Sequence, residues 1–153
     1  MDKQRRDLVT FVCTGNTCRS PMAEALFRME IAGTELGKKF RAASCGVEAI
    51  DGEPASINAQ RTLAEIGVDL SAHRSRRISQ EILDETRVLV ALTQAHFAEV
   101  SALFSQLPPH VFTISLPDPF GATIDGYRVA RDATRAALPQ LIEFLKNLPD
   151  EDQ

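Results

Sequence analysis

One stretch, residues 8–21, constrains the fold of this chain more than any other, and it reads LVTFVCTGNTCRSP. Residues 8–12 are apolar or β-branched, which predicts a short strand buried on both faces. Ser20 and Pro21 favour a helix start, because proline suits the first turn, where its missing N–H is no loss. The stretch therefore predicts a strand, a tight loop over residues 13–19, and then a helix.

The predicted loop has the composition of an anion-binding site. Its backbone N–H groups and those of the first helical turn would converge on one point with positive potential. Cys13 stands at the start of the loop and Arg19 at its end. The helix N-terminus and the guanidinium favour a thiolate over a thiol, and the planar fork of arginine matches two phosphoryl oxygens. The residues between them are small or polar: Thr14, Gly15, Asn16, Thr17 and Cys18.

Phosphoryl transfer through a cysteinyl-phosphate is the chemistry that this segment favours. A cysteine at the end of a buried strand can also be no more than a small hydrophobic residue, but the polar loop around it argues against that. Ser20 has two interpretations, a helix cap or a hydroxyl that donates to the thiolate. Because the loop supplies the charge neutralisation, we expect no metal ion and no other cofactor.

The motif CTGNTCRSP, followed much later by Asp118-Pro119-Phe120, resembles the low-molecular-weight protein tyrosine phosphatase family. The signature of that family is a cysteine, five residues, an arginine, and a serine or threonine. The chain is more narrowly similar to the family's bacterial protein-arginine phosphatase branch. This resemblance covers nearly the whole chain. It implies a phosphatase domain with a four-stranded parallel sheet in the order 2-1-3-4. We expect a single domain over residues 1–153, with residues 1–6 and 149–153 frayed.

Strands that alternate with helices predict the same fold class, an α/β fold with a doubly wound parallel sheet and helices on both faces. Further strands are predicted at residues 40–44, 88–92 and 111–114. The predicted helices run from Ser20 to Gly37 with Met29 on the buried face, from Pro54 to Gly67, from a cap at Thr93, and finally to Leu148 with an interruption and kink at Pro139. All strand-to-helix loops of a parallel sheet emerge at one edge, which brings Asp118 to the rim of the Cys13 loop.

Asp118, in a loop between Pro117 and Pro119, is the predicted general acid and base. A departing oxygen or nitrogen group needs a proton, and a bound phosphate favours the protonated carboxyl by charge repulsion. In the predicted reaction Cys13 attacks phosphorus while Arg19 and the loop N–H groups hold the phosphoryl oxygens. Asp118 then protonates the leaving group and later deprotonates the attacking water.

The resemblance also implies a set of residues that support the loop. His73, in a His-x-x-Arg pattern with Arg76, would support the loop through hydrogen bonds, together with Ser44 and Asn16. The loop itself suggests a redox hypothesis: Cys18 lies near enough to Cys13 in such a turn to capture an oxidised Cys13 as a disulfide.

Substrate choice would depend on Thr17 and Phe120. The tyrosine-specific members of the family typically carry a larger aliphatic residue and a tyrosine at these positions. A threonine leaves space and adds a hydroxyl that suits a polar guanidinium, whereas a neutral loop variant would have no effect. Phe120 would pack on a flat guanidinium or on an aromatic ring. We therefore expect phosphoarginine to be preferred over phosphotyrosine.

Length and composition fit this interpretation. A chain of 153 residues suits one domain, and 44% hydrophobic with 25% charged residues is ordinary for a globular protein. The net charge of -4 gives no reason to expect nucleic acid, and no segment resembles a signal peptide or membrane span. We expect a cytoplasmic enzyme that acts on phosphorylated proteins and releases phosphate. The three cysteines predict no disulfide scaffold, and with three scattered histidines they predict no zinc site.

Three alternatives are left. The chain could be a tyrosine phosphatase of the same family. An arsenate reductase would relay oxidation through two further cysteines in the middle of the chain, and no cysteine follows Cys45. A non-catalytic module that binds phosphorylated residues would need neither Cys13 nor Asp118, and both are present.

Overall fold

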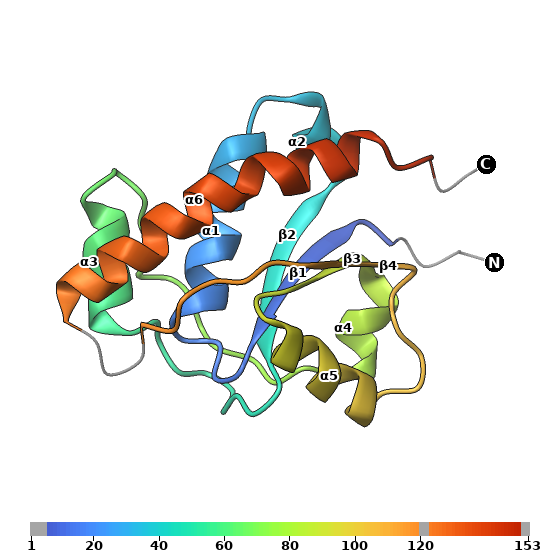
Figure 1. Ribbon diagram of the computed structural model, residues 1–153, viewed down its shortest axis with the longest axis horizontal. Coiled ribbons are helices and arrows are strands. Elements are labelled where there is room, and N and C mark those ends of the chain that lie inside the picture. The colour runs from blue at the N-terminus through green and yellow to red at the C-terminus, as the bar shows by residue number, and fades with distance from the viewer. Residues whose placement is uncertain (1–5, 120–122, 151–153) are drawn as a thin grey trace.

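The computed structural model describes residues 6–119 and 123–150, and they form a parallel sheet covered by helices on both faces (Figure 1). The strands are β1 (Leu8–Cys13), β2 (Arg41–Gly46), β3 (Thr86–Ala91) and β4 (His110–Thr113). All neighbouring strands pair in parallel, in the spatial order β2-β1-β3-β4. The predicted doubly wound α/β fold and its strand order are therefore confirmed.

The helices divide between the two faces of this sheet. They are α1 (Arg19–Ile31), α2 (Glu35–Lys39), α3 (Ile57–Ala64), α4 (Gln80–Glu85), α5 (Gln94–Leu103) and α6 (Ile124–Lys146). Side chains of α1, α3 and α6 form one core with Phe11, and those of α4 and α5 form a second core with Val12. Successive strand residues point to opposite faces, so β1 contributes to both cores.

Strand β1 is the central element and carries the site. All six of its residues are buried, which explains its nearly unbroken apolar run. Its one polar side chain, Thr10, is satisfied by a hydrogen bond of 2.8 Å to the Thr86 hydroxyl of β3. The loop that follows Cys13 is thus attached to the most enclosed strand of the molecule.

The predicted helix from Ser20 to Gly37 is wrong in its second half. Helix α1 ends at Ile31, and the chain turns at Gly33, where φ is 76°, a conformation that favours glycine. Thr34 then caps the short helix α2, in which Gly37 is an interior residue. A Cβ atom at Gly37 would lie 2.4 Å from the Ile31 carbonyl oxygen, so glycine is needed there for close packing. Met29, placed on the buried face by the periodicity, is 40% exposed.

Two other helix predictions also need correction. Helix α3 begins at Ile57, after a Ser56 cap, and Pro54 instead pairs with Arg74 in an isolated bridge. Helix α6 continues through Pro139 without the predicted interruption. Pro139 is exposed, so the carbonyl group that loses its partner faces water. Helix α4 was not predicted at all, because its six residues are too few for a periodic signal.

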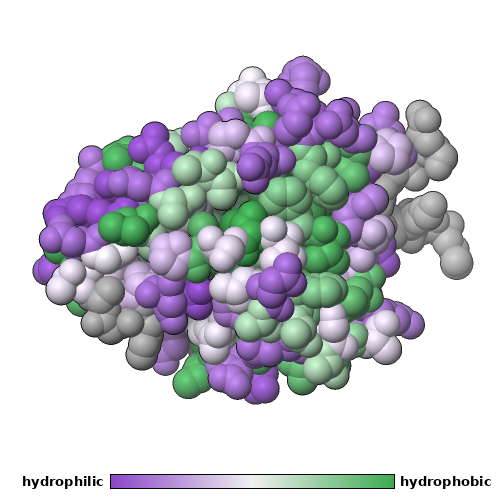
Figure 2. Space-filling model, viewed as in Figure 1, coloured by the Kyte–Doolittle hydropathy of each residue, from purple (hydrophilic) through white to green (hydrophobic). Residues whose placement is uncertain are grey.

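Hydrophobic residues gather around the edge strand β4 on the face shown in Figure 2, and hydrophilic residues follow α3 and α6. The predicted fraying of residues 1–6 and 149–153 falls mainly outside the described residues. Of those described, Arg6 bonds to the Leu83 carbonyl and Pro149 accepts from Arg87. Within the described part of the chain, no helix is long and apolar enough to cross a membrane.

Candidate active site

The loop of residues 13–19 lies at the C-terminal edge of the sheet, between β1 and α1. The segment after β2 holds its carbonyl groups: Val47 donates to the Cys13 carbonyl at 3.0 Å and Glu48 to the Thr14 carbonyl at 2.9 Å. A Cβ atom at Gly46 would lie 2.5 Å from the Thr14 carbonyl oxygen, so this approach requires glycine. The carbonyl dipoles therefore point into the protein, which leaves the loop amides for an anion.

Cys13 Sγ is buried and has two hydrogen-bond partners. The Ser20 hydroxyl lies 2.8 Å away and the Asn16 backbone N–H donates to the sulfur at 3.3 Å. Helix α1 starts at Arg19, and its N-cap residue, Cys18, makes no side-chain capping bond. Ser20 is thus not the helix cap, and its hydroxyl instead contacts the sulfur. An uncapped helix start leaves backbone donors that suit an anion.

Asn16 is the centre of the loop support. It is fully buried and has a positive φ of 58°, which asparagine tolerates better than most residues. Its Nδ2 donates to the hydroxyls of Ser20, at 2.9 Å, and Ser44, at 3.0 Å. Its Oδ1 accepts from the Arg76 backbone N–H at 2.9 Å, and the His73 ring lies 2.8 Å from its carbonyl oxygen. The structure thus brings together the residues that the resemblance named as loop support.

Arg19 and Asp118, which are far apart in the sequence, meet at the same pocket. Arg19 donates to the Leu116 carbonyl at 3.4 Å, and its Nη2 lies 3.7 Å from Asp118 Oδ2. The pocket has a volume of about 310 Å³ and is lined by residues 13–19 and Asp118. The Asp118 side chain is 58% exposed and that of Arg19 is 11% exposed. The guanidinium is therefore fixed within the pocket while the carboxylate stands at its mouth.

His96 is a site residue that the sequence analysis missed. Its ring bridges Thr14 of the loop, at 3.1 Å, and Thr93, at 3.0 Å. Burial and the positive charge of Arg19 lower its pKa, and Asp118 partly opposes this. The available signal was its place in the first turn of a helix that follows a buried parallel strand, which puts it at the edge where ligands bind.

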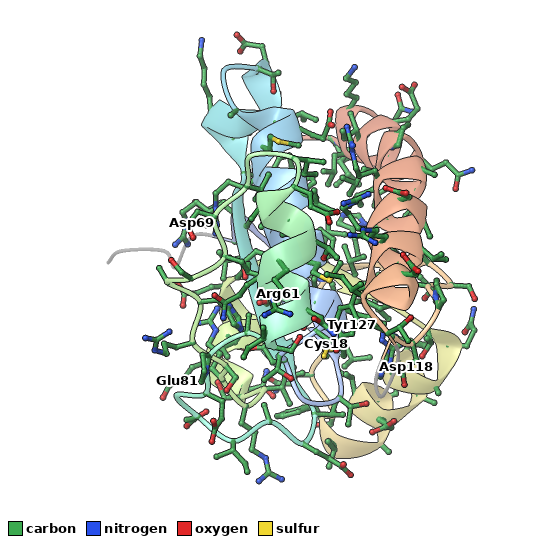
Figure 3. All side chains as sticks on the ribbon, turned by 90° about the vertical axis from the view of Figure 1, so that its left-hand side faces the viewer. Cys18, Arg61, Asp69, Glu81, Asp118 and Tyr127 are labelled. Atoms are coloured by element: carbon green, nitrogen blue, oxygen red, sulfur yellow. The ribbon has the colours of Figure 1, made fainter. Side chains whose placement is uncertain are left out.

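Tyr127 of α6 was predicted only as a core residue, but its hydroxyl contacts the loop. It lies 3.4 Å from both Cys18 Sγ and the Ser56 hydroxyl, and Figure 3 shows Cys18 and Tyr127 side by side. Burial, followed by the hydrogen bond with Cys18, raises the pKa of Tyr127. Cys13 and Cys18 are both free thiols, and the proposed redox role of Cys18 stays a prediction.

Of the two residues predicted to select the substrate, Thr17 and Phe120, the structure describes only Thr17. Thr17 lines the pocket, whereas Phe120 lies outside the described residues. Burial raises the pKa of Cys45 to about 12, so this third cysteine stays a thiol. Among residues 6–119 and 123–150, no three His, Cys, Asp or Glu side chains are grouped to hold a metal ion.

Comparison with known proteins bears on this site. Residues 8–151 match the family described as low molecular weight phosphotyrosine protein phosphatase. The chain is 36% identical to a protein-arginine-phosphatase from Geobacillus stearothermophilus, over 90% of this chain and 95% of that protein. It is 37% identical to one from Bacillus subtilis, over 90% of this chain and 96% of that protein.

A solved structure extends the comparison to the site. It is a mutant of the arginine phosphatase YwlE with a phosphorylated active-site serine, and it superposes with a TM-score of 0.82 at 32% identity. The match covers 92% of this chain and 96% of that one. The fold that surrounds the loop is therefore shared with a protein that has been captured with phosphate on its active-site residue.

Proposed function

Because this chain belongs to the low molecular weight phosphotyrosine protein phosphatase family, we propose that it hydrolyses phosphoarginine residues in proteins through a cysteinyl-phosphate. The observation that carries the proposal is the environment of Cys13 Sγ, which has a hydroxyl at 2.8 Å and a backbone amide at 3.3 Å. Both groups stabilise a thiolate, the reactive form of cysteine. The adjacent Arg19 provides a fork for two phosphoryl oxygens.

The first chemical step is an in-line attack of the Cys13 thiolate on phosphorus. The sulfur–phosphorus bond forms as the phosphorus–nitrogen bond of phosphoarginine breaks. Arg19 and the loop amides neutralise the charge that develops on the phosphoryl oxygens. Ser20 donates to the sulfur at the start and helps it to leave at the end.

Asp118 acts in both halves of the reaction. Its carboxyl group gives a proton to the departing nitrogen, since the arginine side chain is a poor leaving group without one. The resulting carboxylate then takes a proton from water, which attacks phosphorus and releases phosphate and the Cys13 thiolate. The position of Asp118 at the mouth of the pocket, 3.7 Å from Arg19, supports this role because leaving group and water enter there.

Thr17 and the relatives favour arginine as the phosphorylated residue. Two curated relatives, at 36% and 37% identity, are named for that activity. Thr17 lines the pocket with a small hydroxylated side chain, whereas tyrosine-specific members typically carry a larger aliphatic residue there. A hydroxyl offers a hydrogen-bond partner to a guanidinium, which an aliphatic side chain does not.

The test compares phosphate release from peptides that differ only in carrying phosphoarginine, phosphotyrosine or phosphoserine. We expect the intact protein to prefer phosphoarginine, and Thr17→Ile to shift kcat/KM toward phosphotyrosine by about tenfold. Thr17→Val, which removes the hydroxyl at nearly constant size, separates polarity from bulk. Cys13→Ser is the control for contaminating activity. Equal rates on all peptides, or no effect of Thr17→Ile, would remove the case for arginine.

The tyrosine phosphatase alternative predicts the opposite preference in the same experiment.

Cys18 adds a redox hypothesis, in which peroxide oxidises Cys13 and the Cys18 thiol captures it as a disulfide. Mass spectrometry of peroxide-treated protein tests this, and over-oxidised Cys13 with a free Cys18 thiol would contradict it. A cytoplasmic location belongs to the same proposal, because the reducing cytosol keeps free thiols such as Cys13 and Cys18 from forming disulfides.

A further inference from the structure

A chain of hydrogen bonds leads from the nucleophile to Glu24 of α1, a residue that neither the motif nor the relatives assign. It runs from Cys13 Sγ to Ser20 Oγ (2.8 Å), Asn16 Nδ2 (2.9 Å), Ser44 Oγ (3.0 Å) and Glu24 Oε1 (2.5 Å). The three middle residues are at most 3% exposed. The Glu24 end borders a second pocket of about 340 Å³, which Ser44 also lines and which does not include Cys13.

Donor and acceptor capacity fixes the direction of these bonds. The Arg76 backbone N–H can only donate, so the Asn16 atom that it contacts at 2.9 Å is the carbonyl oxygen. The Asn16 NH₂ group must then donate to both Ser20 and Ser44. Each serine oxygen therefore accepts from Asn16 and keeps one hydrogen to donate.

The two remaining hydrogens have one acceptor each. An ionised carboxylate only accepts, so the Ser44 hydroxyl donates to Glu24. The Ser20 hydroxyl is left to donate to Cys13 Sγ. The other Glu24 oxygen pairs with Arg28 Nη2 at 2.5 Å.

Removing the carboxylate would leave the buried Ser44 hydrogen without an acceptor. An unsatisfied buried donor is costly, so Ser44 would rotate and release Asn16. Asn16 has a positive φ, and its backbone N–H donates to Cys13 Sγ. The Asn16 side chain would keep its bonds to Ser20 and to the Arg76 backbone N–H but lose the one to Ser44, which would weaken both bonds that stabilise the thiolate.

We propose that Glu24 is a positioning residue for the nucleophile, which acts through Ser44 and Asn16 to keep the Ser20 hydroxyl and the Asn16 amide directed at Cys13 Sγ. The inference extends the proposed phosphatase function and rests on it only for its catalytic consequence. Its consequence for the thiol can be measured without any substrate.

The experiment measures the pH dependence of Cys13 alkylation by iodoacetamide, located by mass spectrometry, together with kcat/KM for p-nitrophenyl phosphate. We expect Glu24→Ala to move the alkylation midpoint to higher pH and to lower kcat/KM about tenfold. Loss of a negative charge alone would move the midpoint the other way, to lower pH. Glu24→Gln keeps an oxygen that can accept from Ser44, so it should retain the wild-type midpoint and most of the activity.

Two controls isolate the hydrogen-bond chain. Glu30→Ala removes an exposed glutamate from the same helix and should change neither readout. Ser44→Ala should match Glu24→Ala, and the double variant should be no worse than Ser44→Ala alone. Thermal unfolding verifies that each variant is folded.

The outcomes separate this inference from the proposed function. The positioning role would be overturned if Glu24→Ala showed the same alkylation midpoint as Glu30→Ala. It would also be overturned if Glu24→Gln and Glu24→Ala were equally impaired. Wild-type protein that alkylates as expected but does not turn over substrate would refute the phosphatase and leave the role of Glu24 standing.

Discussion

The floor and the rim of the pocket are built in different ways. The floor, here Asn16, Ser20 and Ser44, is at most 3% exposed, and each side chain has more than one hydrogen-bond partner or a carboxylate to pair with. The rim, here Thr17 and Asp118, lines the same pocket but is more accessible: Thr17 is half-buried and the Asp118 side chain is 58% exposed. The floor thus holds the sulfur in place, and the rim meets whatever leaves the phosphorus.

This difference assigns separate tasks to the two regions. Buried polar groups must be satisfied within the protein, so the floor has essentially one geometry for every substrate. The ion pair between Arg19 and Asp118 is long, at 3.7 Å, and its carboxylate is exposed to water, so the pair is weak and can open when a phosphoryl group arrives. A change in the floor should therefore act on all substrates alike, and a change in the rim should depend on the leaving group.

The largest expected effect comes from breaking the rim at Asp118. Asp118→Asn removes the proton donor, so kcat on phosphoarginine and phosphotyrosine peptides should fall by about 10²–10³. With p-nitrophenyl phosphate the rate of the first chemical step should fall much less, because p-nitrophenolate leaves without a proton. Steady-state and burst-phase kinetics on the three substrates measure this. Cys13→Ser is the matched reference, since it should abolish turnover of all of them equally.

If Asp118→Asn lowered kcat equally for all three substrates, Asp118 would behave like a residue of the floor. The proposed division of tasks between floor and rim would then be wrong. A burst of p-nitrophenol followed by slow turnover would sharpen it instead. That result would show that the carboxylate is also needed to activate water against the cysteinyl-phosphate. Glu81→Gln, an exposed acid on α4, serves as a matched control for loss of one carboxylate.

Much of the floor was predictable because Asn16 and Ser20 belong to a contiguous motif, whereas Ser44, in β2, was implied only by the family resemblance. The buried strand, the polar loop and the Ser-Pro exit are local features, and their order predicts the anion site. The α/β class followed equally from local alternation of strands and helices. The prediction of one helix from Ser20 to Gly37 failed for an equally local reason. The apolar spacing continues past Gly33, but the positive φ of Gly33 ends the first helix and Thr34 caps a second one.

The contacts that were missed join segments far apart in the chain. His96 meets Thr14 across 82 residues, and Tyr127 meets Cys18 across 109. Periodicity marks only which face of an element is buried, so it placed Tyr127 in the core without its hydroxyl partner. Glu24 was hidden for the same reason, because a glutamate on a helix normally faces solvent. The partners in these pairings follow from the packing of α1, α5 and α6, and periodicity along the sequence does not identify them.

The smallest expected effect concerns His96, whose ring connects Thr14 of the Cys13 loop to Thr93, the residue that caps α5. Its pKa is lowered in the folded state, first by burial and then by Arg19. As the pH falls below the ordinary value near 6.5, the unfolded chain therefore binds a proton that the folded protein resists, and stability is lost. His96→Gln keeps one side-chain hydrogen bond and cannot titrate, so kcat/KM should fall less than about tenfold.

The pH dependence then separates this role from simple packing. The stability difference between wild type and His96→Gln should be larger at pH 7.5 than at pH 5.5, because only the wild type loses stability through this ring as the pH falls. Thermal unfolding at both pH values measures it, with His110→Gln, at the start of β4, as the matched control. A stability difference between wild type and His96→Gln that did not change with pH would mean that the ring only fills space. His96 would then contribute only to the packing around the loop and would play no part in its electrostatics.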